Sequence, residues 1–311
     1  MKLSVVVPVY QEEEVIDETI FRLTNILEKI DSSYEVIFCV DPGKDSTAVK
    51  LKLANKVNPR IKILEFSRRF GQPAATIAGL LHSTGEFTCV IDADLQDPPE
   101  LIPQMVEECE KGFDVVLATR KSRTGEKISR KFIAKIAYRI IDSLSELEIP
   151  KDTGDCRMFS RRALEALLKT QDQDAFLRGM TAYIGFKQTK VFFDRDPRTK
   201  GNTKYNSMTG SMRIGMNGII GYSQKPLAIM ATVGFLIAGS SLFLAIYFFS
   251  AKLFFQSFTP GLSTMGILLT FFSGVQIFSI GVLGAYMGRI YSEVRNRPNF
   301  IVQEKTGFGE M

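Results

Sequence analysis

The chain has 311 residues, of which 45% are hydrophobic, and its formal net charge is +5. This length allows one large domain and a further segment, and the modest charge is spread too widely to indicate a nucleic-acid-binding protein. The single histidine, His82, leaves very little for a mechanism that needs a histidine base or a histidine-rich metal site. The four cysteines show no paired spacing, which suits a reducing compartment and argues against zinc; they are Cys39, Cys89, Cys109 and Cys156.

Short β-branched runs alternate with helical patterns through the first 120 residues. Strands are predicted at residues 3–10, 34–40, 61–66, 87–92 and 114–119, and the first of the intervening helices is predicted at residues 13–30. This order predicts a parallel α/β sheet. Ligands of such sheets bind at the carboxyl ends of the strands. One crevice is therefore expected to be lined by Tyr10, Asp41, Asp92 and Thr119.

No glycine-rich phosphate loop follows any of these strands. The first strand ends in PVYQEEE, which has no glycine to bring the backbone against a pyrophosphate. The sequence therefore argues against dinucleotide oxidoreductases and P-loop enzymes.

The strongest local signal is VIDADLQDPPE at residues 90–100. An apolar strand delivers Asp92, Asp94 and Gln96 into a loop before a proline pair begins a helix. Asp94 and Gln96 can bring oxygens to one hard cation, with Asp92 beside them to orient a donor. Magnesium or manganese takes few protein oxygens and completes its shell with water and substrate phosphates, which suits a diphosphate leaving group.

Two amphipathic segments follow the predicted sheet. Residues 127–144 place apolar side chains at helical spacing and basic side chains on the other faces. This helix could pack on the sheet or lie at a membrane interface, and the pattern leaves both open. A second, weaker candidate spans residues 208–220.

Two long apolar runs then predict membrane spans. No charged residue occurs from Leu227 to Ala251, and after Lys252 none occurs before Arg289. Each run gives about 25 residues, and about 20 helical residues cross a hydrocarbon core. A buried helical hairpin is the alternative. Basic residues flank the outer ends of the pair, which predicts that both termini and the large domain are cytoplasmic.

Several features together resemble a family-2 glycosyltransferase: PVYQEE at residues 8–13, DADLQDPPE at 92–100, TGDCRMFSR from Thr153, GNTKY at 201–205 and the two C-terminal spans. More narrowly, the chain is similar to the polyprenyl-phosphate branch, which includes dolichol-phosphate mannose synthase and the bacterial bactoprenol glucosyltransferases. RIYSEVRNRPNFIV after the second span looks most like the bacterial enzymes. The resemblance covers essentially the whole chain.

The resemblance implies a GT-A type, Rossmann-like mixed sheet, an amphipathic interface helix and two C-terminal transmembrane helices. The implied domains are a cytoplasmic glycosyltransferase domain at 1–206, a juxtamembrane amphipathic helix at 207–225, the two transmembrane helices at 226–288 and a short polar cytoplasmic tail at 289–311.

The resemblance also assigns roles to individual residues. The implied nucleotide-sugar site comprises Pro8, Tyr10, Glu12, Asp41, Asp92, Ala93, Asp94, Gln96, Arg198 and Lys204. Asp94 and Gln96 are the implied ligands of Mg2+ or Mn2+. Arg198 and Lys204 lie in a basic loop that resembles a mobile acceptor loop, and closure of such a loop would exclude water. A merely flexible loop is the alternative.

Acceptor binding is assigned to two arginines. Arg120 and Arg130 match positions where the family meets the lipid phosphate, and guanidinium groups bind phosphate with paired hydrogen bonds. Surface solvation is their alternative role. Asp94 and Asp155 are the implied catalytic residues. Asp155 is expected to position groups or to act as a weak base, because a phosphate monoester has already lost its protons near neutral pH.

The stretch after the second strand departs from the family pattern. Most members carry two adjacent aspartates followed by Gly-Ser, whereas this chain reads VDPGKDS, with Pro42 in the second position and Lys44 in place of serine. Asp41 can still contact a base or ribose, but Pro42 cannot. This motif therefore does not discriminate uridine from guanosine.

The leading hypothesis is an inverting, metal-dependent transfer of one sugar from UDP-glucose or UDP-N-acetylglucosamine to a polyprenyl phosphate such as undecaprenyl phosphate. A GDP-mannose-using synthase and a catalytically silent nucleotide-sugar-binding scaffold are the alternatives. A processive synthase is disfavoured, because a chain without tryptophan lacks the Gln-x-x-Arg-Trp motif. A plasma-membrane homo-oligomer is expected, and close helix packing, between copies or within one hairpin, would be permitted by Gly234, Ala238, Gly274, Gly281 and Gly284.

Overall fold

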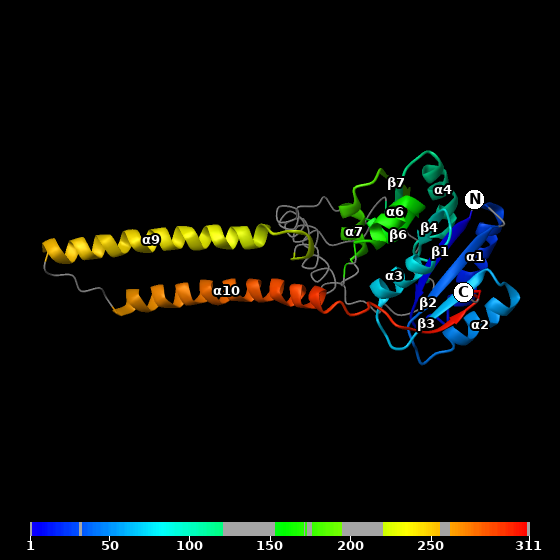
Figure 1. Cartoon of the computed structure of the whole chain (residues 1–311), viewed down its shortest axis with the longest axis horizontal. Coiled ribbons are helices and arrows are strands. Elements are labelled where there is room, and N and C mark those ends of the chain that lie inside the picture. Colours follow the sequence, from blue (N-terminus) through cyan, green and yellow to red (C-terminus); the bar gives the residue numbers. More distant parts are fainter. Residues whose placement is uncertain are drawn as a thin grey trace. The chain divides into compact units, whose positions relative to one another are not determined.

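The computed structural model describes residues 2–30, 33–120, 153–170, 172, 176–194, 220–255 and 262–309. The chain divides into two compact units (Figure 1). The sheet unit comprises Met1–Ile133, Leu147–Gly210 and Asn296–Met311, and the helical unit comprises Ala134–Glu146 and Ser211–Arg295. Several predictions fall outside the described residues: the amphipathic helix at 127–144, the second candidate up to residue 219, and the site residues Arg130, Arg198 and Lys204.

The described elements follow the predicted alternation of strands and helices. The strands are β1 (Leu3–Val9), β2 (Tyr34–Val40), β3 (Ile61–Phe66), β4 (Phe87–Val90), β5 (Val115–Arg120), β6 (Thr153–Ser160), β7 (Gln188–Phe193) and β8 (Val302–Thr306). The helices of the sheet unit are α1 (Ile16–Ile30), α2 (Thr47–Val57), α3 (Gln72–His82), the 3-10 turn η1 (Pro99–Leu101), α4 (Ile102–Glu110), α6 (Arg161–Leu168) and α7 (Leu177–Ile184). The helical unit contains α9 (Lys225–Phe255) and α10 (Leu262–Arg295).

The described strands form one mixed sheet in the order β7-β5-β6-β4-β1-β2-β3-β8. β1 pairs in parallel with β2 and β4, and β2 pairs in parallel with β3. β6 runs antiparallel between β4 and β5, with Thr153 at its start opposite Thr119 near the end of β5. The first residues of β6 therefore lie at the same edge as the carboxyl ends of β1, β2, β4 and β5. The predicted mixed α/β sheet is confirmed.

The core forms because β1 and β2 are buried along their whole length. Strands with both faces covered by helices are apolar throughout, unlike strands with one solvated face. α1 contributes Ile16, Leu23 and Leu27, which recur at helical spacing and are fully buried. α3 packs directly on β1 because Gly79 has no side chain, and a Cβ there would lie 2.2 Å from Cγ1 of Val6.

A buried carboxylate joins four segments of the sheet unit. Glu35 of β2 is 1% exposed and accepts hydrogen bonds from Ser4 Oγ (2.6 Å), Lys62 Nζ (2.6 Å) and the backbone N–H of Thr84 (2.7 Å). Burial acts to raise the pKa of Glu35, but these donors outweigh it and lower the pKa to about 2. Glu35 is therefore ionised in the folded protein at neutral pH.

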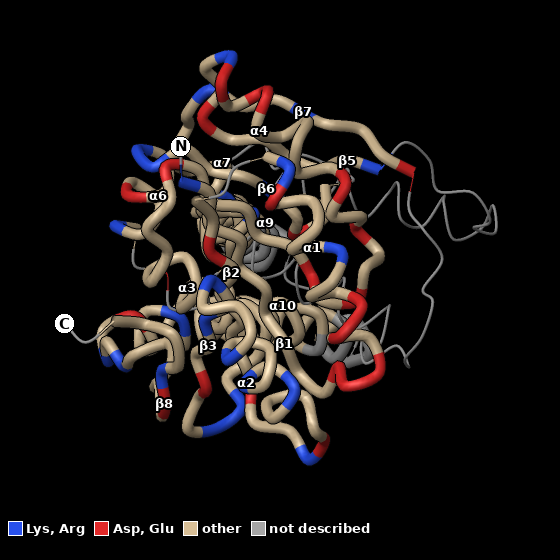
Figure 2. The backbone as a smooth tube through the Cα atoms, turned by 90° about the vertical axis from the view of Figure 1, so that its right-hand side faces the viewer, with Lys and Arg blue, Asp and Glu red and all other residues tan. Residues whose placement is uncertain are grey.

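The C-terminal residues are polar, as predicted, but Val302–Thr306 form an edge strand that was not foreseen. β8 pairs antiparallel with β3, and the red strand lies beside β3 in Figure 1. Lys52 of α2 bridges Glu65 (2.6 Å) and Glu304 (3.0 Å), which ties β8 to the sheet unit. The side chains of β8 are polar and largely exposed, and such a short strand leaves little pattern in a sequence. Over the described part of the sheet unit, Lys and Arg are interspersed with Asp and Glu (Figure 2).

The helical unit is an antiparallel pair of long helices (Figure 1). The segments Lys225–Phe243 and Phe271–Arg295 are long and apolar enough to cross a membrane, and only 0% and 6% of them is buried. Large side chains such as Phe235 and Leu269 are mostly exposed. A buried core hairpin does not fit this exposure. Contiguous exposed apolar surface of this kind requires an apolar environment, which supports a membrane-associated protein.

The two helices meet near the start of α9. The hydroxyl of Tyr286 donates to the carbonyl of Ser223 (2.7 Å), and the guanidinium of Arg289 lies against Gly221 so closely that a Cβ there would be 2.6 Å from Nη1. Further along, a Cβ at Gly234, Gly274, Gly281 or Gly284 would meet no described atom within 4 Å. These glycines do not pack within the described hairpin, and the expected homo-oligomer stays a prediction.

We expect Glu35→Gln to lower the free energy of unfolding by about 1–3 kcal/mol at pH 7, because a buried ionised acceptor is lost. The folded-state pKa of about 2 lies below the ordinary value of 4.5. The stabilisation is therefore complete above pH 4.5 and is lost as the pH falls through 2. Thermal unfolding of the wild type and of Glu35→Gln in detergent, measured from pH 7 to pH 2, checks this. The difference between their midpoint temperatures should decrease only below pH 4.5.

Glu304→Gln is the matched control, since it removes a half-exposed partner of Lys52 and should change stability little. If the difference in midpoint temperature between wild type and Glu35→Gln is the same at every pH, Glu35 does not stabilise the fold as an ionised carboxylate.

Candidate active site

Five strands bring side chains to the edge of the sheet where the sequence predicts a crevice. Tyr10 follows β1, Asp41 follows β2 and Asp92 follows β4, while Arg120 ends β5 and Asp155 lies near the start of β6. Thr119, which was expected to line the crevice, is instead buried in β5. The side chain of Arg120, the next residue, is 31% exposed and reaches the edge of the sheet.

The DADLQ loop alternates partly exposed and buried residues. Asp92, Asp94 and Gln96 are partly exposed, whereas Ala93 and Leu95 are buried. The hydroxyl of buried Thr19 in α1 donates to the carbonyl of Ala93 (2.8 Å), and the backbone N–H of Gln96 donates to Oδ1 of Asp94 (3.1 Å). Helix α1 thus holds the loop from the core side while the three polar side chains reach the crevice.

Two loops at the crevice contain strained backbone. Leu95 has a φ of 56° and Gln11 a φ of 54°, and Asn296 is the other described non-glycine residue with a positive φ. A left-handed conformation is costly for such residues and persists where the surroundings enforce it. In the DADLQ loop the strained residue is Leu95, where the backbone turns between Asp94 and Gln96.

Four carboxylates lie close together at this edge of the sheet: Asp92, Asp94, Asp97 and Asp155. Burial and the negative charges of Asp155, Asp94 and Asp97 raise the pKa of Asp92 well above its usual value, and a hydrogen bond from Gln72 Nε2 (2.7 Å) opposes this only in part. Several carboxylates therefore lie close to one another around Asp92. Such a cluster fits a bound cation.

Within the described part of the chain, no three Asp, Glu, His or Cys side chains come together as a complete metal site. An ion held by Asp94 and Gln96 would therefore take its remaining ligands from water and substrate phosphates, as Mg2+ and Mn2+ sites of this kind do. The residues present fit such an ion.

The loop between β3 and α3 connects three strand ends. Asp41 is buried, and its two carboxylate oxygens accept the backbone N–H groups of Phe70 (2.8 Å) and Gly71 (2.8 Å). In the same loop the guanidinium of Arg69 lies 3.9 Å from the ring centroid of Tyr10. The expected contact of Asp41 with a base or ribose stays a prediction.

The VDPGKDS stretch is bonded to the PVYQEE loop. The backbone N–H of Ser46 donates to Oε2 of Glu13 (2.7 Å), and the backbone N–H of Glu12 donates to Oγ1 of Thr47 (3.0 Å). Pro42 and Lys44 precede these bonded residues in the chain, and both are exposed. Pro8 is buried within β1, in register with Cys39.

Asp155 lies next to basic groups as well as to Asp92. Arg178 of α7 donates through Nε to Oδ1 of Asp155 (3.0 Å). Burial alone would raise the pKa of Asp155, but the charges of Arg178, Arg157 and Arg120 and the hydrogen bond from Arg178 outweigh burial and lower it. Asp155 is therefore ionised at neutral pH and is a weak base.

Arg157 lies fully buried behind this pair. Its Nη2 donates to the carbonyl of Gly154 (2.8 Å) and its Nη1 to Oγ1 of Thr181 (2.9 Å). Burial lowers the pKa of Arg157 to about 10, which still leaves it charged at neutral pH. Arg157 therefore braces the start of α7 against the start of β6.

Five further residues that shape this site carry no clear signal in the sequence: Thr19, Gln72, Asp97, Arg157 and Arg178. Asp97 lies within DADLQDPPE and Arg157 within TGDCRMFSR. Their position in these two stretches is the one sequence feature that indicates a place at the site. Nothing in helical spacing marks Thr19, Gln72 or Arg178 as neighbours of the DADLQ loop or of Asp155.

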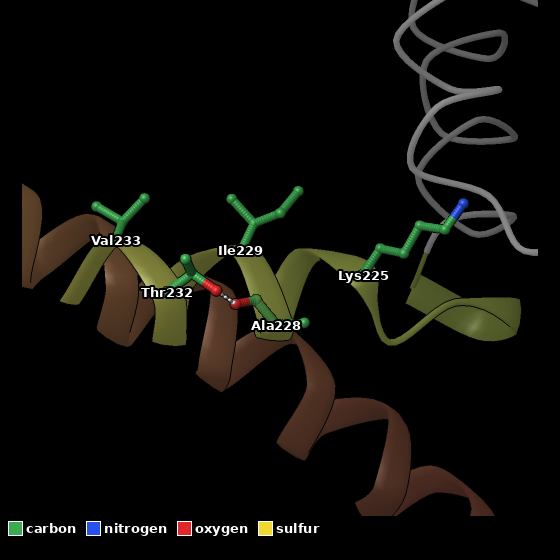
Figure 3. Close-up of a pocket in the computed structure, with 5 residues that line it drawn as sticks. All are labelled: Lys225, Ala228, Ile229, Thr232 and Val233. Atoms are coloured by element: carbon green, nitrogen blue, oxygen red, sulfur yellow. Dashed lines mark hydrogen bonds between the residues drawn. The ribbon is translucent and has the colours of Figure 1, made fainter. Parts of the chain in front are cut away.

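A hollow of about 300 Å³ lies along α9 in the helical unit. Figure 3 shows Ile229 and Val233 projecting from the same side of the helix, with Thr232 bonded to the carbonyl of Ala228 (2.8 Å). Lys225 at one end is the only charged residue of its lining. The hollow belongs to the apolar surface of the helix and lacks converging polar groups, so it is not a candidate active site.

Comparisons with known proteins agree with this geometry. The family model described as glycosyl transferase family 2 matches residues 4–168, from β1 to the end of α6. The chain is 39% identical to an uncharacterized glycosyltransferase of Bacillus subtilis (strain 168), over 99% of this chain and 95% of the relative. It is 32% identical to the SfII prophage-derived bactoprenol glucosyl transferase of Shigella flexneri, over 98% of each chain.

Among solved structures, the mannosyltransferase of Pyrobaculum calidifontis in complex with GDP-mannose and Mn2+ is 16% identical. The match covers 94% of this chain and 86% of that chain with a TM-score of 0.49. This likeness is too distant to carry an argument about the site.

We expect Thr19→Val to loosen the DADLQ loop, because the isosteric side chain cannot donate to the buried carbonyl of Ala93. Loss of one buried hydrogen bond should raise the amide hydrogen exchange of residues 91–97 about tenfold. Thr24→Val is the matched control in the same helix, since the hydroxyl of Thr24 bonds only carbonyls of α1. Equal exchange of this loop in both variants would refute the role of Thr19.

Proposed function

The chain belongs to glycosyl transferase family 2, and we propose that it transfers a single sugar from a nucleotide sugar to the phosphate of a polyprenyl lipid, with inversion at the anomeric carbon. The observation that carries this proposal is the meeting of the DADLQ loop and Arg120 at one edge of the sheet. Asp97, the residue after the loop, lies 4.0 Å from Nη2 of Arg120. The loop proposed to hold the donor therefore lies beside an arginine proposed to bind the acceptor.

Relatives support the acceptor class. Those similar to this chain over nearly its full length include proteins named bactoprenol glucosyl transferase from Shigella flexneri and its phages. The two long apolar helices would keep such an enzyme beside a lipid substrate. Undecaprenyl phosphate is the proposed acceptor on this ground.

The DADLQ loop would hold the donor. Asp94 and Gln96 are the proposed ligands of Mg2+ or Mn2+, with Asp92 beside them and Gln72 fixing the orientation of Asp92. The bound ion would neutralise the negative charge of the departing nucleoside diphosphate. Tyr10, Glu12 and the backbone at Ala93 are the proposed contacts to the nucleotide.

In the proposed reaction, an oxygen of the lipid phosphate forms a bond to the anomeric carbon while the bond from that carbon to the nucleoside diphosphate breaks. The phosphate monoester is already ionised near neutral pH, so the chain need not supply a strong base. Arg120 orients the attacking phosphate through its fixed fork of N–H donors. The low basicity of Asp155 is in keeping with this mechanism.

Three further roles concern residues outside the described part of the chain. Arg130 would contact the lipid phosphate together with Arg120. Arg198 and Lys204 would close over donor and acceptor and exclude water that would hydrolyse the sugar nucleotide. The basic flanks of the spans favour a catalytic domain and termini on the cytoplasmic side of the plasma membrane, with a homo-oligomer formed through the helices.

The donor is proposed to be UDP-glucose or UDP-N-acetylglucosamine, and a GDP-mannose-using synthase is the alternative. The exposed Pro42 and Lys44 favour neither nucleoside. The same departure from the family pattern is the observation that keeps a catalytically silent nucleotide-sugar-binding scaffold as a second candidate.

We expect Asp94→Asn to reduce transfer by about 100-fold or more while leaving the protein folded, because a proposed metal ligand is lost from a partly exposed loop. Transfer of labelled sugar into the lipid phase, measured across a manganese titration, checks this. Asp17→Asn is the control, since Asp17 of α1 forms an exposed pair with Lys50 of α2. Full activity of Asp94→Asn with an unchanged metal requirement would overturn the assignment of the site.

A further inference from the structure

Arg178 lies at the crevice without a role in the reaction described so far. It is the second residue of α7, and its side chain is 30% exposed. Its Nε donates to Oδ1 of Asp155, whose side chain is 38% exposed. The pair therefore faces solvent at the edge where donor and acceptor would meet, and is not part of the core.

The position of Arg178 is set by the buried layer below it. Arg157 bonds the carbonyls of Gly154 (2.8 Å) and Leu177 (3.4 Å). One residue further along each element, Asp155 meets Arg178. A fully buried arginine thus sets the register between β6 and α7, and this register brings the exposed pair together.

Arg120 reaches the same place from β5. A Cβ at Gly154 would lie 3.9 Å from Nη2 of Arg120 and 3.2 Å from Oδ2 of Asp97. The guanidinium of Arg120 therefore lies within contact distance of the start of β6, and its charge acts on Asp155. Two partly exposed guanidiniums, on β5 and α7, flank one carboxylate.

The chemistry of this arrangement suits a phosphate. A guanidinium has five N–H donors, and the bond to Asp155 uses only the one on Nε. That bond fixes the plane of the group, so the donors on its two terminal nitrogens are held in one orientation. A carboxylate that orients an arginine in this way increases the precision with which the arginine can bind an anion.

We propose that Arg178 and Arg120 together bind the phosphate of the lipid acceptor, and that Asp155 is a positioning residue that holds Arg178. This inference rests on the proposed function, because it assigns residues to the acceptor half of that reaction. The acceptor is favoured over the donor diphosphate because the proposed donor site binds its diphosphate through a cation held by Asp94 and Gln96, whereas guanidinium groups bind a phosphate directly.

The first experiment measures equilibrium binding to the full-length protein in detergent. The probes are farnesyl phosphate for the acceptor, and UDP and GDP with manganese for the donor. Arg178→Ala should weaken binding of farnesyl phosphate about 10- to 100-fold, as expected for loss of a charged hydrogen bond donor, and should leave nucleotide binding within about twofold. Unchanged farnesyl phosphate binding, or weakening confined to the nucleotide, would overturn the inference.

Arg162→Ala is the matched control. Arg162 forms a comparable ion pair with Asp114, in which Nη2 lies 2.7 Å from Oδ2. Asp114 precedes β5, so this pair lies at the opposite edge of the sheet from the crevice. Arg162→Ala should leave binding of both probes unchanged.

The second experiment separates positioning from base catalysis at Asp155. Asp155→Asn keeps an oxygen that can accept from Nε of Arg178, whereas Asp155→Ala does not. If Asp155 positions Arg178, the asparagine variant should turn over within about tenfold of the wild-type rate and bind farnesyl phosphate nearly as wild type, and the alanine variant should bind it as weakly as Arg178→Ala. Turnover by Asp155→Asn that is slower by about 100-fold or more, with unchanged binding, would identify a base instead and overturn the positioning role.

Different results would refute the proposed function and the inference about Arg178. A wild-type protein that transfers no sugar from any nucleotide donor contradicts the proposed function, yet binding of farnesyl phosphate that depends on Arg178 would still support the inference. A protein that transfers sugar to the lipid with full farnesyl phosphate binding in Arg178→Ala retains the proposed function and loses the inference.

Discussion

The antiparallel run of β6 between β4 and β5 is the constraint on which the candidate site depends. In a wholly parallel sheet the start of a strand lies at the edge opposite to the carboxyl ends of its neighbours. Because β6 is reversed, Asp155 near its start lies beside Asp92 after β4 and Arg120 at the end of β5. One edge thereby collects both an acidic loop and basic groups.

Two carboxylates at this edge, Asp92 and Asp155, have unlike surroundings. Burial and neighbouring carboxylates raise the pKa of Asp92, whereas three arginines lower the pKa of Asp155 against the effect of burial. Carboxylates whose pKa values are shifted in opposite directions are typical of functional sites. Here the DADLQ loop fits a cation with a diphosphate and the arginines fit a phosphate monoester, which together match transfer from a nucleotide sugar to a lipid phosphate.

Much of the sheet unit follows from sequence, since buried strands are continuous apolar runs, and β2 and β3 have the predicted limits. The DADLQ loop was predictable because polar residues that end a buried strand must face the crevice. The direction of β6 was not, because side-chain alternation carries no information on which strands pair. The burial of Arg157 could not be predicted, since arginine is rarely fully buried. β8 could not be predicted either, because it is short and polar and shows no pattern typical of a strand. The assignments of Arg130, Arg198 and Lys204 stay predictions.

The central claim is that this crevice joins a sugar to a lipid phosphate. The most direct test is transfer of radiolabelled sugar by the purified protein in detergent, with several nucleotide sugars, undecaprenyl phosphate and manganese or magnesium, followed by counting of the organic phase. The account predicts label in the lipid fraction from one donor, dependent on both the lipid phosphate and the metal. Measurable nucleotide-sugar binding with no transfer from any donor would contradict it and favour the silent scaffold.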